Sequence, residues 1–136
     1  MTPEDFARLG ASFMASDAAL ELIEKCLGTK KIAKNAATLK CAKKVLTNVK
    51  KCVDSGRAAH DAYLFEKTDA FIAQLPLEDQ DVLKNPRILK RLHAAQVRWM
   101  DEAEERAAKI IAPCMENLLP SGTGLNGFRI GRRRRR

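Results

Sequence analysis

The chain has 136 residues, a formal net charge of +8 and 46% hydrophobic residues. This length predicts one domain with its own core and excludes two independent catalytic domains. Because only 5% of the residues are aromatic, a base-stacking sheet of the RRM kind is disfavoured, and the basic charge points to contact with a phosphate backbone.

No run approaches the roughly 18 to 20 apolar residues that cross a bilayer, and the acidic opening is unlike a signal peptide. We therefore expect an intracellular protein, in a host cytoplasm, without a membrane contact.

Two short helices are expected at the start of the chain. Residues 2–5 form a helix-start signature, because the Thr2 hydroxyl can cap an orphan amide and the proline that follows suits the first turn. This helix is expected to run to about Met14. A second begins with the caps at Ser16 and the aspartate after it, and Gly28 ends it.

The most distinctive stretch lies between Lys25 and Val53, which holds nine lysines and no acidic residue. We expect a helix from near Thr29 to near Ser55 and Gly56. Wound at about 3.6 residues per turn, it separates a polar from an apolar face, and the apolar residues alternate in steps of three and four. The polar face holds Lys40, Lys43, Lys44, Thr47, Lys50 and Lys51, and the apolar face holds Leu39, Ala42, Val45, Leu46, Val49 and Val53.

The missing counter-charge makes this helix a candidate phosphate-binding element. A merely soluble helix usually places Glu among its lysines, because like charges about four residues apart repel each other. A solvated lysine face is the alternative interpretation. The candidate nucleic-acid-binding residues on or just before this helix are Lys30, Lys31, Lys34, Lys40, Lys43, Lys44, Thr47, Asn48, Lys50 and Lys51.

Further helices are expected after the basic one. A fourth stretch should run from about Arg57 to Leu75 and end at Pro76, and an acidic turn follows over 78–81. Asn85 and the proline after it open a last long helix, which Pro113 should kink or end. Its two halves differ in charge and so need different neighbours. The first half carries Arg87, Lys90, Arg91 and Arg98, and the second carries Asp101, Glu102, Glu104 and Glu105.

The fold class predicted from these elements is all-α, because no segment of β period is present. We expect an antiparallel helical bundle over 1–119 that forms a nucleic-acid-binding domain, followed by a flexible tail over 120–136. The run SGTGLNG cannot bury enough apolar surface to fold, so the arginine-rich arm after it should be disordered. The arm is interpreted as a nucleic-acid contact, a nuclear import signal or an incidental tail. Its last residues are Arg132, Arg133, Arg134, Arg135 and Arg136.

The four cysteines are predicted to be buried free thiols. Cys26, Cys41, Cys52 and Cys114 lie within helical apolar patterns and lack CxxC or paired-histidine spacing. Neither a disulfide framework nor a zinc site is therefore favoured.

No catalytic constellation is recognisable in the sequence. His60 and His93 lie in separate helical segments, and Asp61, next to His60, is expected to point to another side of its helix. A glycine-rich phosphate loop and the common hydrolase motifs are missing. We expect no enzyme, no cofactor or metal, and no small-molecule substrate. Trp99 is interpreted as a core or dimer-interface anchor.

The order of the expected helices along the chain resembles that of a known protein family. A helix that ends in Gly28 precedes the long basic helix, and residues 64–67, with the sequence LFEK, follow like the opening of a short third helix. The long helix carries the spaced residues Cys41, Lys44, Val49, Lys51 and Val53. Over roughly half of the chain this arrangement is similar to the double-stranded-RNA-binding RNA-silencing suppressors of nodaviruses.

The resemblance implies an antiparallel homodimer that forms a four-helix bundle, lies along one side of an A-form duplex and protects it from silencing nucleases. It also implies that Cys41, Lys44 and Lys51 face RNA. The chain departs from the family in the longer connection between Val53 and Leu64, and in the additional helix and arm after Pro86.

Two other functions are compatible with the sequence. One is a helical viral coat protein or nucleoprotein whose arginine-rich tail neutralises a packaged genome. The other is a DNA-binding regulator, although no compact helix-turn-helix with Arg, Asn and Gln for base edges is present.

Overall fold

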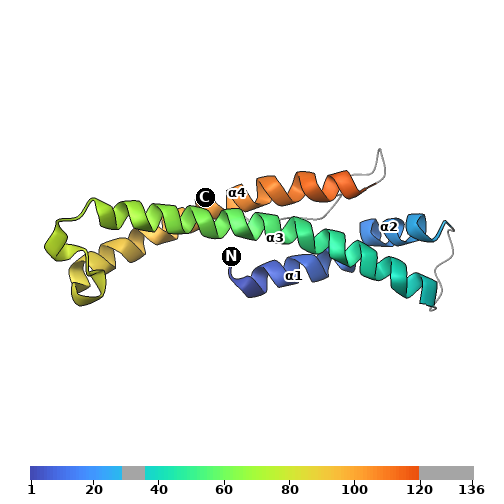
Figure 1. The fold of residues 1–136 in the computed structure, drawn as a ribbon, viewed down its shortest axis with the longest axis horizontal. Helices are drawn as coiled ribbons and strands as arrows, with labels where there is room; N and C mark the ends of the chain where they lie inside the picture. The colour runs from blue at the N-terminus through green and yellow to red at the C-terminus, as the bar shows by residue number, and fades with distance from the viewer. Residues whose placement is uncertain (29–35, 120–136) are drawn as a thin grey trace.

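The computed structural model describes residues 1–28 and 36–119, and over these residues the protein is all-α, as predicted. Helix α3 spans most of the length of the molecule, α4 returns antiparallel to it, and α1 and α2 lie beside the first half of α3 (Figure 1). The helices are α1 (Pro3–Met14), α2 (Asp17–Leu27), α3 (Ala36–Ala73) and α4 (Pro86–Leu118), and two 3-10 turns, η1 (Leu77–Asp79) and η2 (Val82–Lys84), join α3 to α4. The tail predicted over 120–136 lies outside the described residues.

The predicted boundaries of α1 and α2 are confirmed. The Thr2 hydroxyl accepts a hydrogen bond from the amide of Asp5 at 3.2 Å, and the Asp5 carboxylate accepts one from the Thr2 amide at 2.8 Å. The backbone hydrogen bond from Thr2 holds the pKa of Asp5 below its ordinary value. Helix α2 starts after Ser16 and ends at Gly28, whose φ of 69° is the left-handed conformation that glycine adopts without strain.

The predicted break at Ser55 and Gly56 is wrong, because α3 is one continuous helix of 38 residues. Gly56 is buried where α3 meets α4, and a Cβ atom added to it would collide with Ile111 and lie 3.1 Å from the carbonyl oxygen of Ala107. A glycine within a helix costs only about 1 kcal/mol, which close packing of two helices can offset. Gly56 is therefore a packing residue of α3 and does not end it.

The core has two parts. The main part lies among α1, α2, the first half of α3 and the second half of α4, and includes Phe13, Val49 and Met115. A smaller part lies between the second half of α3 and the first half of α4, where the ring of Trp99 contacts Phe71 edge to face at 6.1 Å. The two halves of α4 thus have different neighbours, as their different charge suggested, and Trp99 belongs to the core.

The remaining helix ends agree with the sequence in part. The Asn85 side chain accepts a hydrogen bond from the amide of Ile88 at 3.3 Å, which confirms the predicted start of α4. Helix α4 continues through Pro113 to Leu118, so the proline does not end it. Among the described helices, none combines the length and the apolar character that a bilayer crossing requires.

Leu39 was expected on the apolar face of the basic helix, yet 57% of it is exposed. Helix α1 runs antiparallel to α3, with Phe6 beside His60 and Gly10 beside Val53. Because α1 ends before it reaches the first turn of α3, it does not cover Leu39.

Replacing Gly56 with alanine should lower the free energy of unfolding by about 1–3 kcal/mol, because the methyl group displaces Ile111 in a filled core. Gly10→Ala is the matched control, since its Cβ would meet only Val53 at 4.0 Å. The Gly10→Ala change should leave the free energy of unfolding unchanged or raise it by up to about 1 kcal/mol. Urea unfolding of both variants measures the difference, and equal stabilities would contradict the close approach of α3 and α4.

Candidate nucleic-acid interface

The first half of α3 presents a row of five exposed lysines, which we call the lysine row. They recur at helical spacing, so their ammonium groups lie along one side of the helix with the exposed Thr47 among them. The lysine row consists of Lys40, Lys43, Lys44, Lys50 and Lys51.

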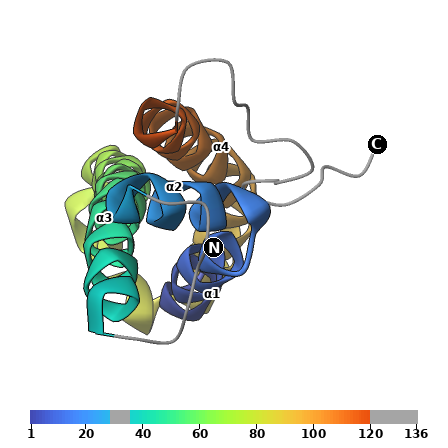
Figure 2. The same ribbon diagram turned by 90° about the vertical axis from the view of Figure 1, so that its right-hand side faces the viewer.

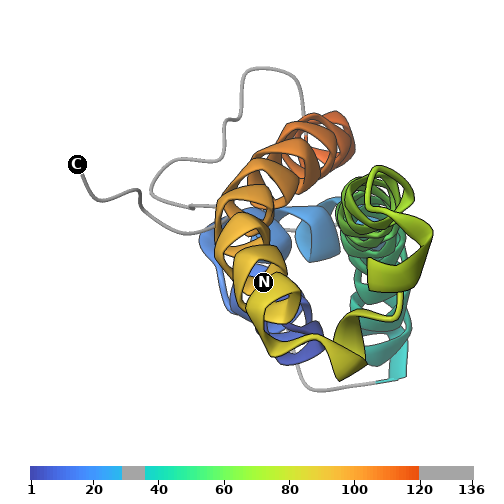
Figure 3. The same ribbon diagram turned by 90° about the vertical axis from the view of Figure 1, so that its left-hand side faces the viewer.

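The lysine row is exposed because the other helices pack on one side of α3 only. Val45, Val49 and Val53 are buried on the side that meets α1, α2 and α4. Views along the molecule show these three helices gathered on one side of α3 (Figures 2 and 3). The lysines therefore occupy the side of α3 that is turned away from the core.

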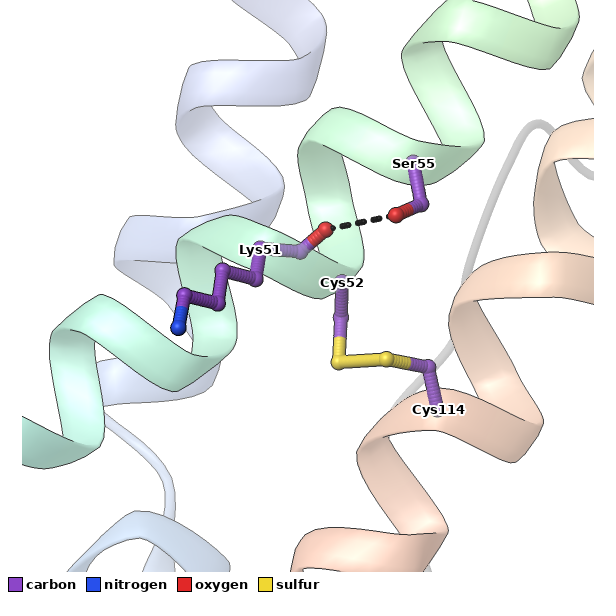
Figure 4. Close-up of a disulfide and its surroundings, with 4 residues drawn as sticks. All are labelled: Lys51, Cys52, Ser55 and Cys114. Carbon is purple, nitrogen blue, oxygen red and sulfur yellow. Dashed lines mark hydrogen bonds between the residues drawn. A yellow bond between two sulfur atoms is a disulfide. The ribbon is translucent and has the colours of Figure 1, made fainter.

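A disulfide fixes this orientation at the end of the row. Cys52 of α3 is bonded to Cys114 of α4, and the two Cα atoms are 5.6 Å apart. Figure 4 shows the Lys51 side chain extending away from α4 while the sulfur of Cys52 points toward Cys114. Rotation of α3 about its own axis would break this bond, so the lysine row is held outward.

No ion pair of the described residues includes a member of the lysine row. Asp54, one turn after Lys50 on α3, is exposed and also forms none of these ion pairs. The register of α3 against α4 keeps the carboxylates of α4 away from the row. Tyr63 donates a hydrogen bond to Glu102, so the acidic part of α4 lies beside Tyr63. Tyr63 is twelve residues, or about 18 Å of helix, beyond Lys51. The same hydrogen bond raises the pKa of Tyr63. The carboxylates of α4 at 101–105 are thus directed to a different part of α3.

Another basic residue, Lys25, joins the lysine row through packing. It lies in the last turn of α2 and, with Lys44 and Asn48, lines a pocket of about 450 Å³. The same pocket has apolar walls that include Val45 and Leu118. The sequence analysis missed Lys25 as a candidate, because only the packing of α2 on α3 brings it beside Lys44.

Thr47 and Asn48 differ in their surroundings. The exposed hydroxyl of Thr47 donates to the carbonyl oxygen of Lys43 at 2.9 Å, which leaves its lone pairs facing solvent. Asn48 is half-buried at the wall of the pocket. Both supply polar groups next to the lysine row, as the sequence suggested.

The expectation of free thiols is wrong, and so is the inclusion of Cys41 among residues that face RNA. Cys41 is only 7% exposed and forms a disulfide with Cys26, with the Cα atoms 5.7 Å apart. It lies on the side of α3 that meets α2, one turn before Val45. Spacing rules based on CxxC do not detect such bonds, because they join facing helices that are distant in sequence.

The expected third helix at 64–67 is also absent as a separate element. Residues 64–67 lie inside α3, which continues without interruption to Ala73. Phe65 is 74% exposed, whereas the half-buried Leu64 packs against the smaller part of the core. The longer connection noted between Val53 and Leu64 is thus part of the same helix.

His60 has polar neighbours that the sequence analysis did not foresee. Asp61 reaches its Nδ1 at 3.0 Å, although a different orientation was expected for adjacent residues of a helix. The amine of Met1 lies 3.3 Å from the His60 Nε2 and 2.7 Å from Glu104. His60 is 2% exposed and Glu104 is also buried, so this group links α1 to α3 and α4 inside the bundle.

Some candidate residues lie outside the described parts of the chain. They are Lys30, Lys31 and Lys34, together with Arg132, Arg133, Arg134, Arg135 and Arg136. Within residues 1–28 and 36–119, no three His, Cys, Asp or Glu side chains come together in a group that could hold a metal ion.

Comparison with known proteins adds no relative, since no family model, no curated protein and no solved structure matches the chain.

Removing both cysteines of the Cys52–Cys114 pair by substitution with alanine should lower the free energy of unfolding by about 4 kcal/mol, because the bond closes a sequence separation of 62 residues. The Cys26–Cys41 pair spans 15 residues, and its double alanine variant should lose about 3 kcal/mol. Urea unfolding without reductant measures both. If reductant leaves the parent protein equally stable, the disulfides do not form in solution.

Proposed function

We propose that the chain binds double-stranded RNA through the phosphate backbone, without regard to sequence, and acts as a viral suppressor of RNA silencing. The observation that carries the proposal is the lysine row, in which five ammonium groups share one exposed side of a helix and form no ion pair with a carboxylate of residues 1–28 and 36–119. Phosphates supply the missing negative charge, and the released counterions favour binding.

The shape of the lysine row supports a duplex as its ligand. From Lys40 to Lys51 the helix rises by about 17 Å, so the helix backbone holds the five lysines in a linear row. A duplex holds its phosphates in a fixed array, whereas a single strand must be ordered first. Phosphate contacts of this kind position a protein on the duplex but do not read its sequence.

The chemistry of the row favours RNA. The major groove of A-form RNA is too narrow for side chains, and its minor-groove side presents phosphates and 2′-hydroxyls. Lysine binds phosphate as a point charge, and the side chains of Thr47 and Asn48 can exchange hydrogen bonds with 2′-hydroxyls. A protein that grips any duplex in this way blocks the nucleases that would process it, which is how suppression would follow from binding. Homodimerisation stays a prediction from the family resemblance.

The charge-reversal variant Lys44→Glu/Lys51→Glu tests the proposal. Loss of two charge-assisted contacts should weaken binding to an RNA duplex of about 20 base pairs roughly 100-fold. The slope of log affinity against log salt should become shallower by about 1 for each lost contact. Fluorescence anisotropy across a salt series measures both quantities, and circular dichroism checks the fold.

The matched control is Lys67→Glu/Lys109→Glu, which makes the same change in net charge at two exposed lysines away from the row. This control should lose little affinity. If the two variants bind duplex RNA equally well, net charge rather than the lysine row governs binding, and the proposed site is wrong.

Deletion of 121–136 separates this function from that of a coat protein or nucleoprotein. The shortened chain should bind duplex RNA more weakly and with a shallower salt dependence, yet still prefer duplex RNA over single strands and duplex DNA. Gel shifts with the three nucleic acids measure the preference. Complete loss of binding would favour a packaging role for the arginine tail, and preference for duplex DNA would favour a DNA-binding regulator.

A further inference from the structure

A second basic surface lies on the first half of α4. Between Val82 and Met100 the chain has no acidic residue, and the four arginine and lysine residues of this part of α4 are exposed. We call them the arginine surface. Its members are Arg87, Lys90, Arg91 and Arg98.

The arginine surface is held outward by the smaller part of the core. Leu92, Ala95 and Trp99 are buried on a neighbouring side of α4, where they meet the second half of α3. Arg91 lies at the edge of the surface, with its guanidinium 5.9 Å from the centre of the Phe71 ring. No ion pair of the described residues includes a member of the arginine surface.

The two basic surfaces lie on different helices and at different places along the molecule. Glu102 of α4 lies beside Tyr63, about 18 Å of helix beyond Lys51. Because α4 runs antiparallel to α3, Arg98 lies about one turn further on, so Lys51 and Arg98 are separated by about 24 Å along the molecule. The members of both surfaces are exposed and lie outside the contact between α3 and α4. Figure 3 shows the first half of α4 beside the second half of α3.

We infer that the arginine surface binds a second nucleic-acid duplex, so that one protein molecule bridges two duplex segments. This inference rests on the proposed function of the lysine row, because bridging requires both surfaces. A separation of about 24 Å is about three times the Debye length of about 8 Å at physiological ionic strength, so the repulsion between the two bound duplexes is largely screened. Arginine also binds phosphate through paired hydrogen bonds, which suits an anionic duplex.

Bridging is tested with two RNA duplexes of about 20 base pairs, one biotinylated and one fluorescent. The full chain is mixed with both, and the fluorescence captured on streptavidin beads reports bridging. The test variant is Arg87→Gln/Lys90→Gln/Arg98→Gln, which keeps Arg91 on Phe71. The matched control is Arg8→Gln/Lys67→Gln/Lys109→Gln, which removes the same charge from other exposed positions.

The parent and the control should capture the fluorescent duplex, whereas the arginine-surface variant should fall to the background without protein. The same variant should still bind a single duplex, measured by anisotropy, because its lysine row is intact. Capture at the parental level by the arginine-surface variant would overturn the inference. That result would also follow if a dimer bridged duplexes through two lysine rows.

Failure of the proposed function gives a different result. The lysine row is therefore tested in the arginine-surface variant, where Lys44→Gln/Lys51→Gln should weaken the single-duplex binding that remains. If the added change leaves that binding as tight as before, the lysine row is not the site and the proposed function loses its support. If the added change weakens binding but capture survives in the arginine-surface variant, the lysine row stands and only the bridging inference fails.

Discussion

The candidate interface depends on the one-sided packing of α3. Helices α1, α2 and α4 all bury their apolar residues against the same side, so the opposite side of the first half stays open along its length. Gly56 lets α4 approach closely, and the Cys52–Cys114 bond fixes the rotation of α3 relative to it. These contacts hold the lysine row outward even though its members repel one another.

The charges of the two long helices are distributed so that they do not cancel at the lysine row. Each helix is basic in its first half and more acidic in its second. Because the two helices run antiparallel, the register between them decides which charges lie beside each other. The register set by Cys52 with Cys114 and by Tyr63 with Glu102 places the acidic part of α4 beside Tyr63, in the second half of α3. Like charges thus remain clustered at both ends of the bundle. Such clustering costs stability, which the core and the disulfides offset, and polyanions relieve it.

The disulfides affect how the protein should be studied. Both join α3 to a neighbouring helix, and the Cys26–Cys41 bond lies beside Lys25 and Lys44 at the candidate interface. Disulfides are typical of oxidising compartments, whereas the composition predicts an intracellular protein. The redox state therefore has to be controlled in every binding measurement, since Cys26–Cys41 is the covalent bond between α2 and α3 at the candidate interface.

The sequence by itself determined the helical class, the caps at Thr2, Ser16, Gly28 and Asn85, and the separation of lysines from valines around the basic helix. These features depend on residues a few positions apart, where propensity and periodicity act directly. Only the tertiary structure decided that α3 passes through Gly56, that the cysteines pair, and that Lys25 joins the lysine row. Each of these depends on contacts between helices distant in sequence. A glycine that looks like a helix end, or a cysteine that looks like a small apolar residue, takes its role from the helix it faces.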